Sequence, residues 1–404
     1  MNKIHALIFF FFLQSLALHA QQSYRAVLKR ADGFDIVFNI IESRTAKGIG
    51  WEIRNADERI QITEIRQKAD SLLVNMPFFD AELLLKKNLM GYEGQWKKVG
   101  SKGDVYMPLL IQKGTERIQL SSSTPSKNIS GRWKTIFTNP EGKRSMAIAE
   151  FSHEGNKLKG TFLTPTGDYR FLEGTIAGDS LTLTTFDGTH AFYFAAKVDK
   201  QGNMVNGVFA SGPTYLERWE AVKDLNVELD GSEAVMKVRD PNAKLNFRFL
   251  DLDSNWVSIN DQRFQNKVVI IQIMGSWCPN CMDETAFLSD YYRKNKERGL
   301  EIIGLAYEYS LEFAKARKSL SRFRDKFKVE YPMLITGVTS SDERRTEKTL
   351  PQMTPIKAFP SMIILGKDGK VRQTHAGYEG PATGIHHERF KKEFSATIDQ
   401  LLKQ

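Results

Sequence analysis

The chain has 404 residues, which is longer than one ordinary domain and predicts two or three. Hydrophobic residues make up 41% and charged residues 26%, so large disordered regions are not expected. The formal net charge is +9, but lysine and arginine are interleaved with aspartate and glutamate along the chain. Because nucleic-acid binding is associated with a compact basic stripe, we interpret this charge as a solvated surface and expect no nucleic-acid partner.

Residues 1–20 have the layout of a secretory signal peptide. Lys3 gives a positive start, residues 6–13 (ALIFFFFL) form an apolar run, and small residues follow at Ala17 and Ala20. The apolar run is shorter than the ~20 residues that a membrane-spanning helix needs. We therefore predict export to the periplasm with no transmembrane span in the mature chain; an uncleaved anchor is the alternative.

Residues 21–223 show the pattern of antiparallel β-structure. Polar and apolar residues alternate with a period of two in several segments, which indicates strands with one buried face. From Gly131 onward, turn signals recur every ~10–14 residues, as expected for a meander that closes into a lipocalin-like barrel or a sandwich. A polar break divides a β-rich module (21–125) from a meander or barrel module (126–223); one continuous barrel is the alternative.

Residues 224–241 are polar and aperiodic, which predicts a linker, and residues 242–404 have the pattern of an α/β domain. The expected order of strand, helix, strand, helix, hairpin and final helix is typical of a mixed sheet. The segments are a strand at 268–274, a helix at 279–298, a strand at 301–306, a helix at 311–327, hairpin strands at 361–365 and 371–376, and a helix at 386–402. The predicted fold is therefore multi-domain, with an all-β region before an α/β domain.

The chain contains two cysteines, Cys278 and Cys281, three positions apart. A disulfide between them closes almost no loop, so a chemical role accounts for the pair better than a stabilising one. Pro279 suits the first position of a helix, which places Cys278 at the helix cap, where unpaired N–H groups and the helix dipole lower its pKa. We expect an exposed nucleophile at Cys278, a recessed resolving cysteine at Cys281, and a redox-active disulfide between them.

Two other uses of the cysteine pair are not supported by the sequence. A structural zinc site needs four ligands, and no second Cys or His pair has suitable spacing. Covalent haem attachment needs a histidine after the second cysteine, and that position is Met282. We therefore expect neither a metal nor another cofactor.

The segment 268–281 (VVIIQIMGSWCPNC), with the following Met-Asp-Glu, resembles the active-site segment of the thioredoxin superfamily. It is most similar to the TlpA/ResA-like periplasmic thiol–disulfide oxidoreductases, and the resemblance covers residues 242–404. This resemblance implies a thioredoxin-like domain with protein-disulfide reductase activity. The preceding β region resembles lipocalin-like domains in general pattern only.

The resemblance also implies a substrate site around the cysteines. Thioredoxin-like domains carry a cis-proline opposite the cysteine pair, and Pro360, before the hairpin, occupies that place. A cis Pro360 would turn the backbone of Phe359 toward the sulfurs, where both residues are expected to hold an extended substrate; a trans-proline at an edge strand is the alternative. Trp277 and Pro279, on either side of Cys278, are expected to line the same surface, although simple packing also explains an indole.

The resemblance also implies a proton-handling role for Glu284, because the matching acid in TlpA-like proteins is linked to proton handling at the cysteines. Glu284 lies one turn after Cys281, where side chains at i and i+3 are neighbours on a helix. Position 272, which carries a buried aspartate in cytosolic thioredoxins, is Gln272 here and cannot titrate. Glu284 is therefore expected to take the proton when Cys281 ionises, with a solvated surface glutamate as the alternative.

Two tyrosines and two histidines are interpreted as packing or surface residues. Tyr307 and Tyr309 follow the strand at 301–306, where core or surface packing is favoured over a role at a groove. His386 and His387 precede the last helix and are expected to be solvated.

The sequence thus predicts an exported thiol–disulfide oxidoreductase that reduces, or isomerises, disulfides of periplasmic proteins by exchange at Cys278 and Cys281. By resemblance, a membrane-bound thiol electron donor would restore the reduced state. The alternative is a β-domain protein that binds a partner, lipid or glycan and carries the redox domain as an accessory.

Overall fold

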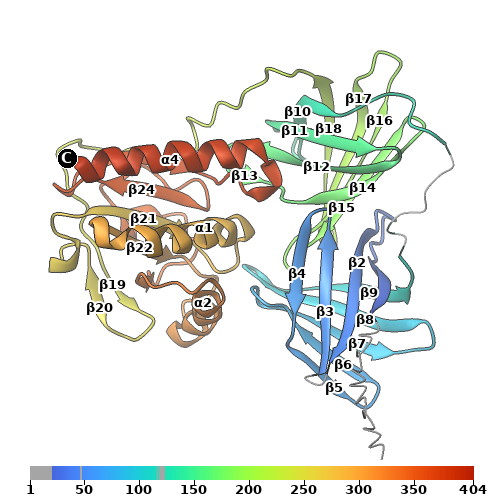
Figure 1. Ribbon diagram of the computed structural model, residues 1–404, viewed down its shortest axis with the longest axis horizontal. Helices are drawn as coiled ribbons and strands as arrows, with labels where there is room; N and C mark the ends of the chain where they lie inside the picture. Colours follow the sequence, from blue (N-terminus) through green and yellow to red (C-terminus); the bar gives the residue numbers. More distant parts are fainter. Residues whose placement is uncertain (1–20, 46–47, 116, 118–122) are drawn as a thin grey trace, which may run out of the picture.

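The computed structural model describes residues 21–45, 48–115, 117 and 123–404, and the predicted signal peptide lies outside them. The strands form three sheets, two built from the N-terminal half of the chain and one from the C-terminal half. The C-terminal part carries the long helices and lies beside both N-terminal sheets (Figure 1). In the described part of the chain, no helix is both long and apolar enough to cross a bilayer.

The first sheet is an antiparallel meander whose two edge strands follow each other in the chain. Its strand order is β4-β3-β2-β1-β9-β8-β7-β6-β5, and only residues 63–64 separate β4 from β5, so the sheet curls until its edges meet. Alternate residues are buried, as in β4, because one face packs inward. The strands are β1 (Gln22–Leu28), β2 (Ile36–Thr45), β3 (Gly48–Asn55), β4 (Glu58–Ile62), β5 (Ile65–Lys68), β6 (Ser71–Asn75), β7 (Ala81–Lys87), β8 (Gly91–Gly100) and β9 (Gly103–Lys113).

The second sheet closes into an antiparallel barrel. Strand β11 pairs with both β10 and β12, and β10 pairs with β18, so the strands form a ring without free edges. The strands are β10 (Gly131–Thr138), β11 (Arg144–Glu154), β12 (Lys157–Thr164), β13 (Gly167–Asp168), β14 (Leu172–Ala177), β15 (Ser180–Phe186), β16 (Ala191–Val198), β17 (Met204–Ser211) and β18 (Tyr215–Lys223). The predicted all-β region with an antiparallel barrel is confirmed.

Aromatic rings fill the interior of this barrel. Phe162 is fully buried and stacks on Phe194 with ring centroids 4.7 Å apart, and Phe194 stacks on Phe209 at 4.5 Å. Phe137 and Trp219 pack edge-on or tilted against the same group. The rings bury a large apolar area and hold the strands together.

The third sheet is mixed and belongs to the predicted α/β domain. Strands β21, β22 and β23 run parallel, and β24 pairs antiparallel with β21. Its strands are β19 (Arg248–Asp251), β20 (Trp256–Ser258), β21 (Val268–Met274), β22 (Leu300–Ala306), β23 (Met333–Ile335), β24 (Ser361–Leu365) and β25 (Val371–Ala376). The helices are η1 (Gln262–Phe264), α1 (Pro279–Asn295), η2 (Lys296–Arg298), α2 (Phe313–Phe327), α3 (Arg345–Thr349), η3 (Pro381–Thr383) and α4 (Ile385–Lys403).

Strand β21 lies in the middle of this domain, and all of its residues are buried. Ile270 and Met274 point to the face that is covered by α1, α2 and α4, whereas Ile271 and Ile273 point to the opposite core. A strand buried on both faces has the continuous apolar run that the sequence shows here. It holds the start of α1 in a fixed position at its carboxyl end.

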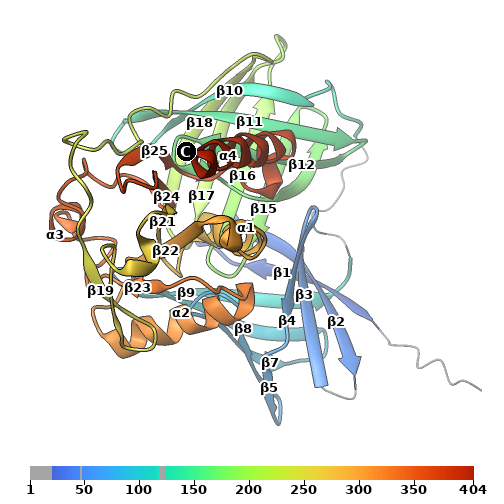
Figure 2. The same ribbon diagram turned by 60° about the vertical axis from the view of Figure 1, so that its left-hand side comes forward.

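Both N-terminal sheets contact the helices of the α/β domain (Figure 2). Phe78, after β6, stacks on Phe327 of α2 at 5.8 Å, and Asp80 accepts a hydrogen bond of 2.6 Å from Ser319. The barrel contacts α4, where Glu150 lies 2.7 Å from His386. His386 is buried, so the prediction that it is solvated is wrong; the barrel covers this end of the helix.

Phe162→Ala should lower the free energy of unfolding of the barrel by about 3–5 kcal/mol, because the remaining rings cannot fill the cavity. Tyr106→Ala is the control, since Tyr106 is 47% exposed on β9. The control should change the stability by less than about 1 kcal/mol. Urea unfolding followed by tryptophan fluorescence measures both, and equal effects would contradict the packing described here.

Candidate functional site

Cys278 and Cys281 lie at the start of α1, and they are joined by a disulfide. Cys278 is the N-cap residue, Pro279 takes the first helical position, and the Cys278 Sγ accepts a hydrogen bond of 3.2 Å from the backbone N–H of Cys281. The predicted cap position of Cys278 is confirmed. Backbone donors at this end of a helix favour a negative charge, which stabilises a thiolate once the disulfide is reduced.

Cys278 is only 4% exposed, and Cys281 is fully buried. The prediction of an exposed nucleophile is therefore wrong for this conformation. The barrel covers the first turn of α1, where Asn280 donates a hydrogen bond of 3.1 Å to the carbonyl of Asp168. Pro279 is also buried, so its expected part in a substrate surface stays a prediction. These contacts join residues more than 100 positions apart, and no local pattern indicates them.

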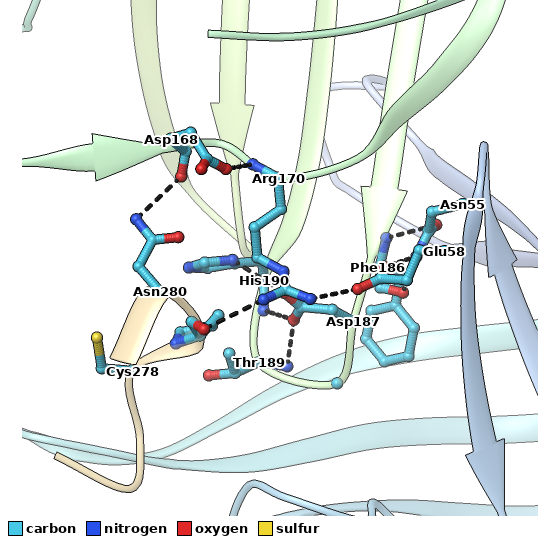
Figure 3. A network of polar contacts seen from close by, with 12 residues as sticks. Asn55, Glu58, Asp168, Arg170, Phe186, Asp187, Thr189, His190, Cys278 and Asn280 are labelled. Atoms are coloured by element: carbon cyan, nitrogen blue, oxygen red, sulfur yellow. Dashed lines mark hydrogen bonds and ion pairs between the residues drawn. The ribbon is translucent and has the colours of Figure 1, made fainter. Parts of the chain in front are cut away.

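Arg170 lies at the end of the barrel nearest α1 and makes the central contact between the barrel and this helix (Figure 3). Its guanidinium donates to the carbonyl of Pro279 at 3.1 Å and pairs with Asp283, both in the first turns of α1. On its other side it pairs with Glu58 of the first sheet and lies 3.5 Å from Asp187 of the barrel. One buried cation thus links the first sheet and the barrel to helix α1, next to the cysteine pair.

The acidic partners of Arg170 differ in their charge near neutral pH. Burial alone would raise the pKa of Asp187, but His190 and Arg170 outweigh it and lower the pKa to about 2. Burial raises the pKa of Asp283 to about 7, although Arg170 opposes the rise. Asp187 is therefore ionised near neutral pH, whereas burial makes Asp283 easier to protonate than an ordinary aspartate.

Glu284 is fully buried on α1, which excludes the alternative of a solvated surface glutamate. Gln272 of β21 donates hydrogen bonds to Glu284 at 2.9 Å and to Thr285 at 3.0 Å. Burial raises the pKa of Glu284 to about 8, and the bond from Gln272 opposes this only in part. Gln272 therefore holds the carboxyl in place without changing its own charge.

Trp277 joins the cysteine turn to the residues around the predicted cis-proline. Its indole N–H donates to the carbonyl of Tyr307 at 2.9 Å, and its ring stacks on Tyr309 with centroids 4.9 Å apart. Phe359 packs on the same indole at 5.4 Å, and the Phe359–Pro360 peptide bond is cis, as predicted. The structure thus brings Trp277 and Phe359 together, and their roles in substrate binding stay predictions.

A cavity of about 340 Å³, here called the Trp277 cavity, lies beside the cysteine turn. Ser276, Trp277 and Glu308 form its wall on the α/β side. Glu308 is buried and accepts hydrogen bonds from the backbone N–H of Ser276 at 2.8 Å and from its hydroxyl at 2.6 Å. Burial raises the pKa of Glu308 to about 7.

Glu308 was not predicted from the sequence as a site residue. A usable signal was present, because an acidic residue shortly after a buried parallel strand lies at the carboxyl edge of the sheet, where ligand sites of α/β folds occur. Tyr307 is fully buried, as its packing interpretation requires, and Tyr309 is half-buried and borders the cavity.

Residues 237–387 match the Redoxin family model, and this domain has the thioredoxin fold. The chain is 26% identical over 132 residues to the thiol-disulfide oxidoreductase ResA of Bacillus thuringiensis subsp. konkukian. That match covers 33% of this chain and 66% of the relative, so the chain spans slightly less than two thirds of its length. Mouse (Mus musculus) nucleoredoxin is 30% identical over 120 residues, which cover 30% of this chain and 25% of nucleoredoxin. The predicted resemblance to ResA-like proteins is confirmed.

Two solved structures of thiol–disulfide proteins are similar to part of the chain. A thioredoxin-family thiol:disulfide interchange protein from Chlorobium tepidum is 16% identical, with a TM-score of 0.30, and covers 41% of this chain and 99% of its own. A thiol-disulfide oxidoreductase from Bacteroides fragilis is 20% identical, with a TM-score of 0.27, and covers 38% and 99%.

Glu284→Gln should remove a pH-dependent loss of stability. The pKa of Glu284 is about 8 in the folded protein, above its ordinary value of 4.5, so the folded state keeps a proton that the unfolded chain loses. The stabilisation is complete below the unfolded pKa and disappears as the pH rises through the folded pKa. Relative to wild type, the variant should gain about 4 kcal/mol in unfolding free energy between pH 5 and pH 8.5.

Urea unfolding at several pH values tests this gain, with Glu228→Gln as the control at an exposed position. The difference between Glu284→Gln and wild type should grow with pH, whereas the control should stay parallel to wild type. A constant difference for Glu284→Gln would show that the carboxyl is already ionised in the folded state.

Arg170→Met should destabilise the protein by about 3–5 kcal/mol at pH 7, because buried acidic groups would lose their cation. Methionine keeps much of the volume of the side chain. Arg144→Met is the control, because Arg144 pairs with Glu220 at the surface, where both side chains are more than 60% exposed. The control should change the stability by less than about 1 kcal/mol. Similar urea midpoints for the two variants would remove Arg170 as the central contact.

Proposed function

We propose that this chain is an exported thiol–disulfide oxidoreductase that reduces, or isomerises, disulfides of periplasmic proteins at Cys278 and Cys281. The observation that carries the proposal is the disulfide at the start of α1, where the Cys278 sulfur accepts a backbone N–H bond. The match to the Redoxin model and the similarity to ResA support it. Residues 1–20 support export through their sequence pattern.

In the reduced protein, the Cys278 thiolate attacks a substrate disulfide and forms a mixed disulfide, while the first substrate thiolate leaves and takes a proton. Cys281 then loses its proton and attacks the Cys278 sulfur. The second substrate thiol leaves, and the protein ends with the Cys278–Cys281 disulfide. Two electrons pass from the protein to the substrate, and a membrane-bound thiol donor would return them.

Glu284 is suited to the proton step at Cys281. The two residues are neighbours at i and i+3 on α1, and the pKa of Glu284 is about 8, close to the ordinary pKa of about 8.5 for a cysteine thiol. Proton transfer is efficient between groups of matched pKa. In molecules whose Glu284 carboxyl is ionised, Glu284 accepts the proton of Cys281 when this thiol must ionise, and it returns the proton when the disulfide is reduced again.

The alternative in which the β region binds a lipid or glycan gains no support from the barrel, because aromatic rings fill its interior. The contacts support a different part for the β region. Arg170 donates to the carbonyl of Pro279, and the carbonyl of Asp168 accepts from Asn280, so the β region covers the cysteine turn and would control access to the sulfurs.

Cys278→Ser should reduce the activity with hydroxyethyl disulfide to the uncatalysed rate, because serine provides no thiolate. Cys281→Ser should instead accumulate the mixed disulfide at Cys278, since nothing resolves it. Mass spectrometry of the non-reduced protein detects the adduct, and a coupled thiol assay gives the rate. Activity of Cys278→Ser equal to wild type would end the proposal.

A further inference from the structure

The Trp277 cavity is formed jointly by the α/β domain, the first sheet and the barrel. The first sheet contributes β7 and β8, the barrel contributes Thr189, and the α/β domain contributes Trp277 and α2. Such a cavity exists only where the N-terminal region packs on the redox domain. It ends at Ser276 and Trp277, the two residues directly before Cys278.

Cations outnumber anions around this cavity. Its basic side chains are Lys97, Lys98, Lys315, Lys318 and Arg322, and its acidic ones are Asp80, Glu82 and Glu308. Three of the five cations pair with carboxylates: Arg322 with Asp80, Lys97 with Asp104, and Lys315 with Glu312. Glu308 accepts both hydrogen bonds of Ser276. Among the described lining residues, Lys98 and Lys318 are therefore the cations without an ion pair, against Glu82 as the carboxylate with neither an ion pair nor such a hydrogen bond, which leaves a small positive excess. Lys318 is exposed and has no ion pair or hydrogen bond to any residue that the structure describes. The cavity therefore attracts anionic groups.

The size of the cavity limits what can bind beside the cysteine turn, where the lining includes Ser276 and Trp277 but neither cysteine. A cavity of about 340 Å³ lies at the lower end of the range of about 300–1,000 Å³ for small-molecule sites. Cys278 is 4% exposed, so a folded protein surface cannot approach its sulfur in this conformation. A narrow chain or a small molecule fits the dimensions.

We propose that the Trp277 cavity binds the carboxylates of a narrow acidic disulfide and presents its S–S bond to Cys278. The disulfide belongs either to a free molecule of tripeptide size or to an extended acidic segment of a protein. This inference rests on the proposed function and names its substrate class. The Cys278 thiolate breaks the substrate S–S bond, Cys281 displaces the second thiol, and the substrate gains two electrons and two protons.

A charge series of small disulfides tests the proposal. The protein is first reduced with dithiothreitol and desalted, and single-turnover rates are measured with oxidised glutathione (anionic), hydroxyethyl disulfide (neutral) and cystamine (cationic). Each rate is divided by the rate of free dithiothreitol with the same compound, which removes differences in intrinsic reactivity. The same comparison is made with two unstructured disulfide-linked peptides, one flanked by Glu and one by Lys. It tests whether the substrate disulfide belongs to an acidic segment of a protein.

We expect a normalised preference of about tenfold for oxidised glutathione over cystamine at low salt, and a smaller one at high salt. Lys318→Glu should lower the ratio by about fivefold. Lys134→Glu, which makes the same charge change at an exposed position on β10, should leave it unchanged. A preference with small compounds alone identifies a free molecule, and one with peptides alone identifies a protein segment.

Equal normalised rates across both charge series would overturn the inference, and so would equal ratios in the Lys318→Glu and Lys134→Glu proteins. In either case, turnover of hydroxyethyl disulfide that depends on Cys278 would leave the proposed function standing. Loss of all turnover, with wild type equal to Cys278→Ser, would remove the proposed function and the inference with it.

Discussion

The buried guanidinium of Arg170 is the contact on which the arrangement of the site depends. It pairs with Glu58 of the first sheet, lies beside Asp187 in the barrel, and binds Asp283 and the carbonyl of Pro279 at the start of α1. A buried charge is tolerated only where partners compensate for its lost hydration. Because these partners come from the first sheet, the barrel and helix α1, the charge is fully compensated only when these three parts are assembled. The environment of the cysteine pair therefore depends on the whole chain.

The N-terminal region covers the cysteine turn, and the burial of acidic groups near this turn has a consequence for the charge of the dithiol. Three carboxyl groups near the turn, those of Asp283, Glu284 and Glu308, have pKa values raised to between about 7 and 8 by burial. Near neutral pH these groups are protonated for much of the time, so they repel a neighbouring thiolate less than ordinary carboxylates would. The helix dipole and the positive charge of Arg170 attract a negative charge, so they also favour the thiolate.

Sequence patterns predicted the parts of this fold that depend on local order. Three predicted features have a direct local cause and are present in the structure. They are the apolar run of β21, Pro279 at the first position of α1, and the alternation in the β strands. The pairing of Arg170 with Asp283 joins positions 113 residues apart. No periodicity or turn signal encodes such a contact. The burial of Cys278, which follows from the same packing, was therefore beyond the reach of the sequence.

Glu284 shows how the two kinds of information combine. Its spacing from Cys281 singled it out, but spacing alone left a solvated surface glutamate as the alternative. The structure excludes that alternative through burial and the 2.9 Å bond from Gln272. A neutral amide at position 272 supplies a donor without adding a second titrating carboxyl, so a single group responds to the proton of Cys281. Had position 272 carried an aspartate, the two buried acids would have titrated as a coupled pair, and their proton would belong to neither residue alone.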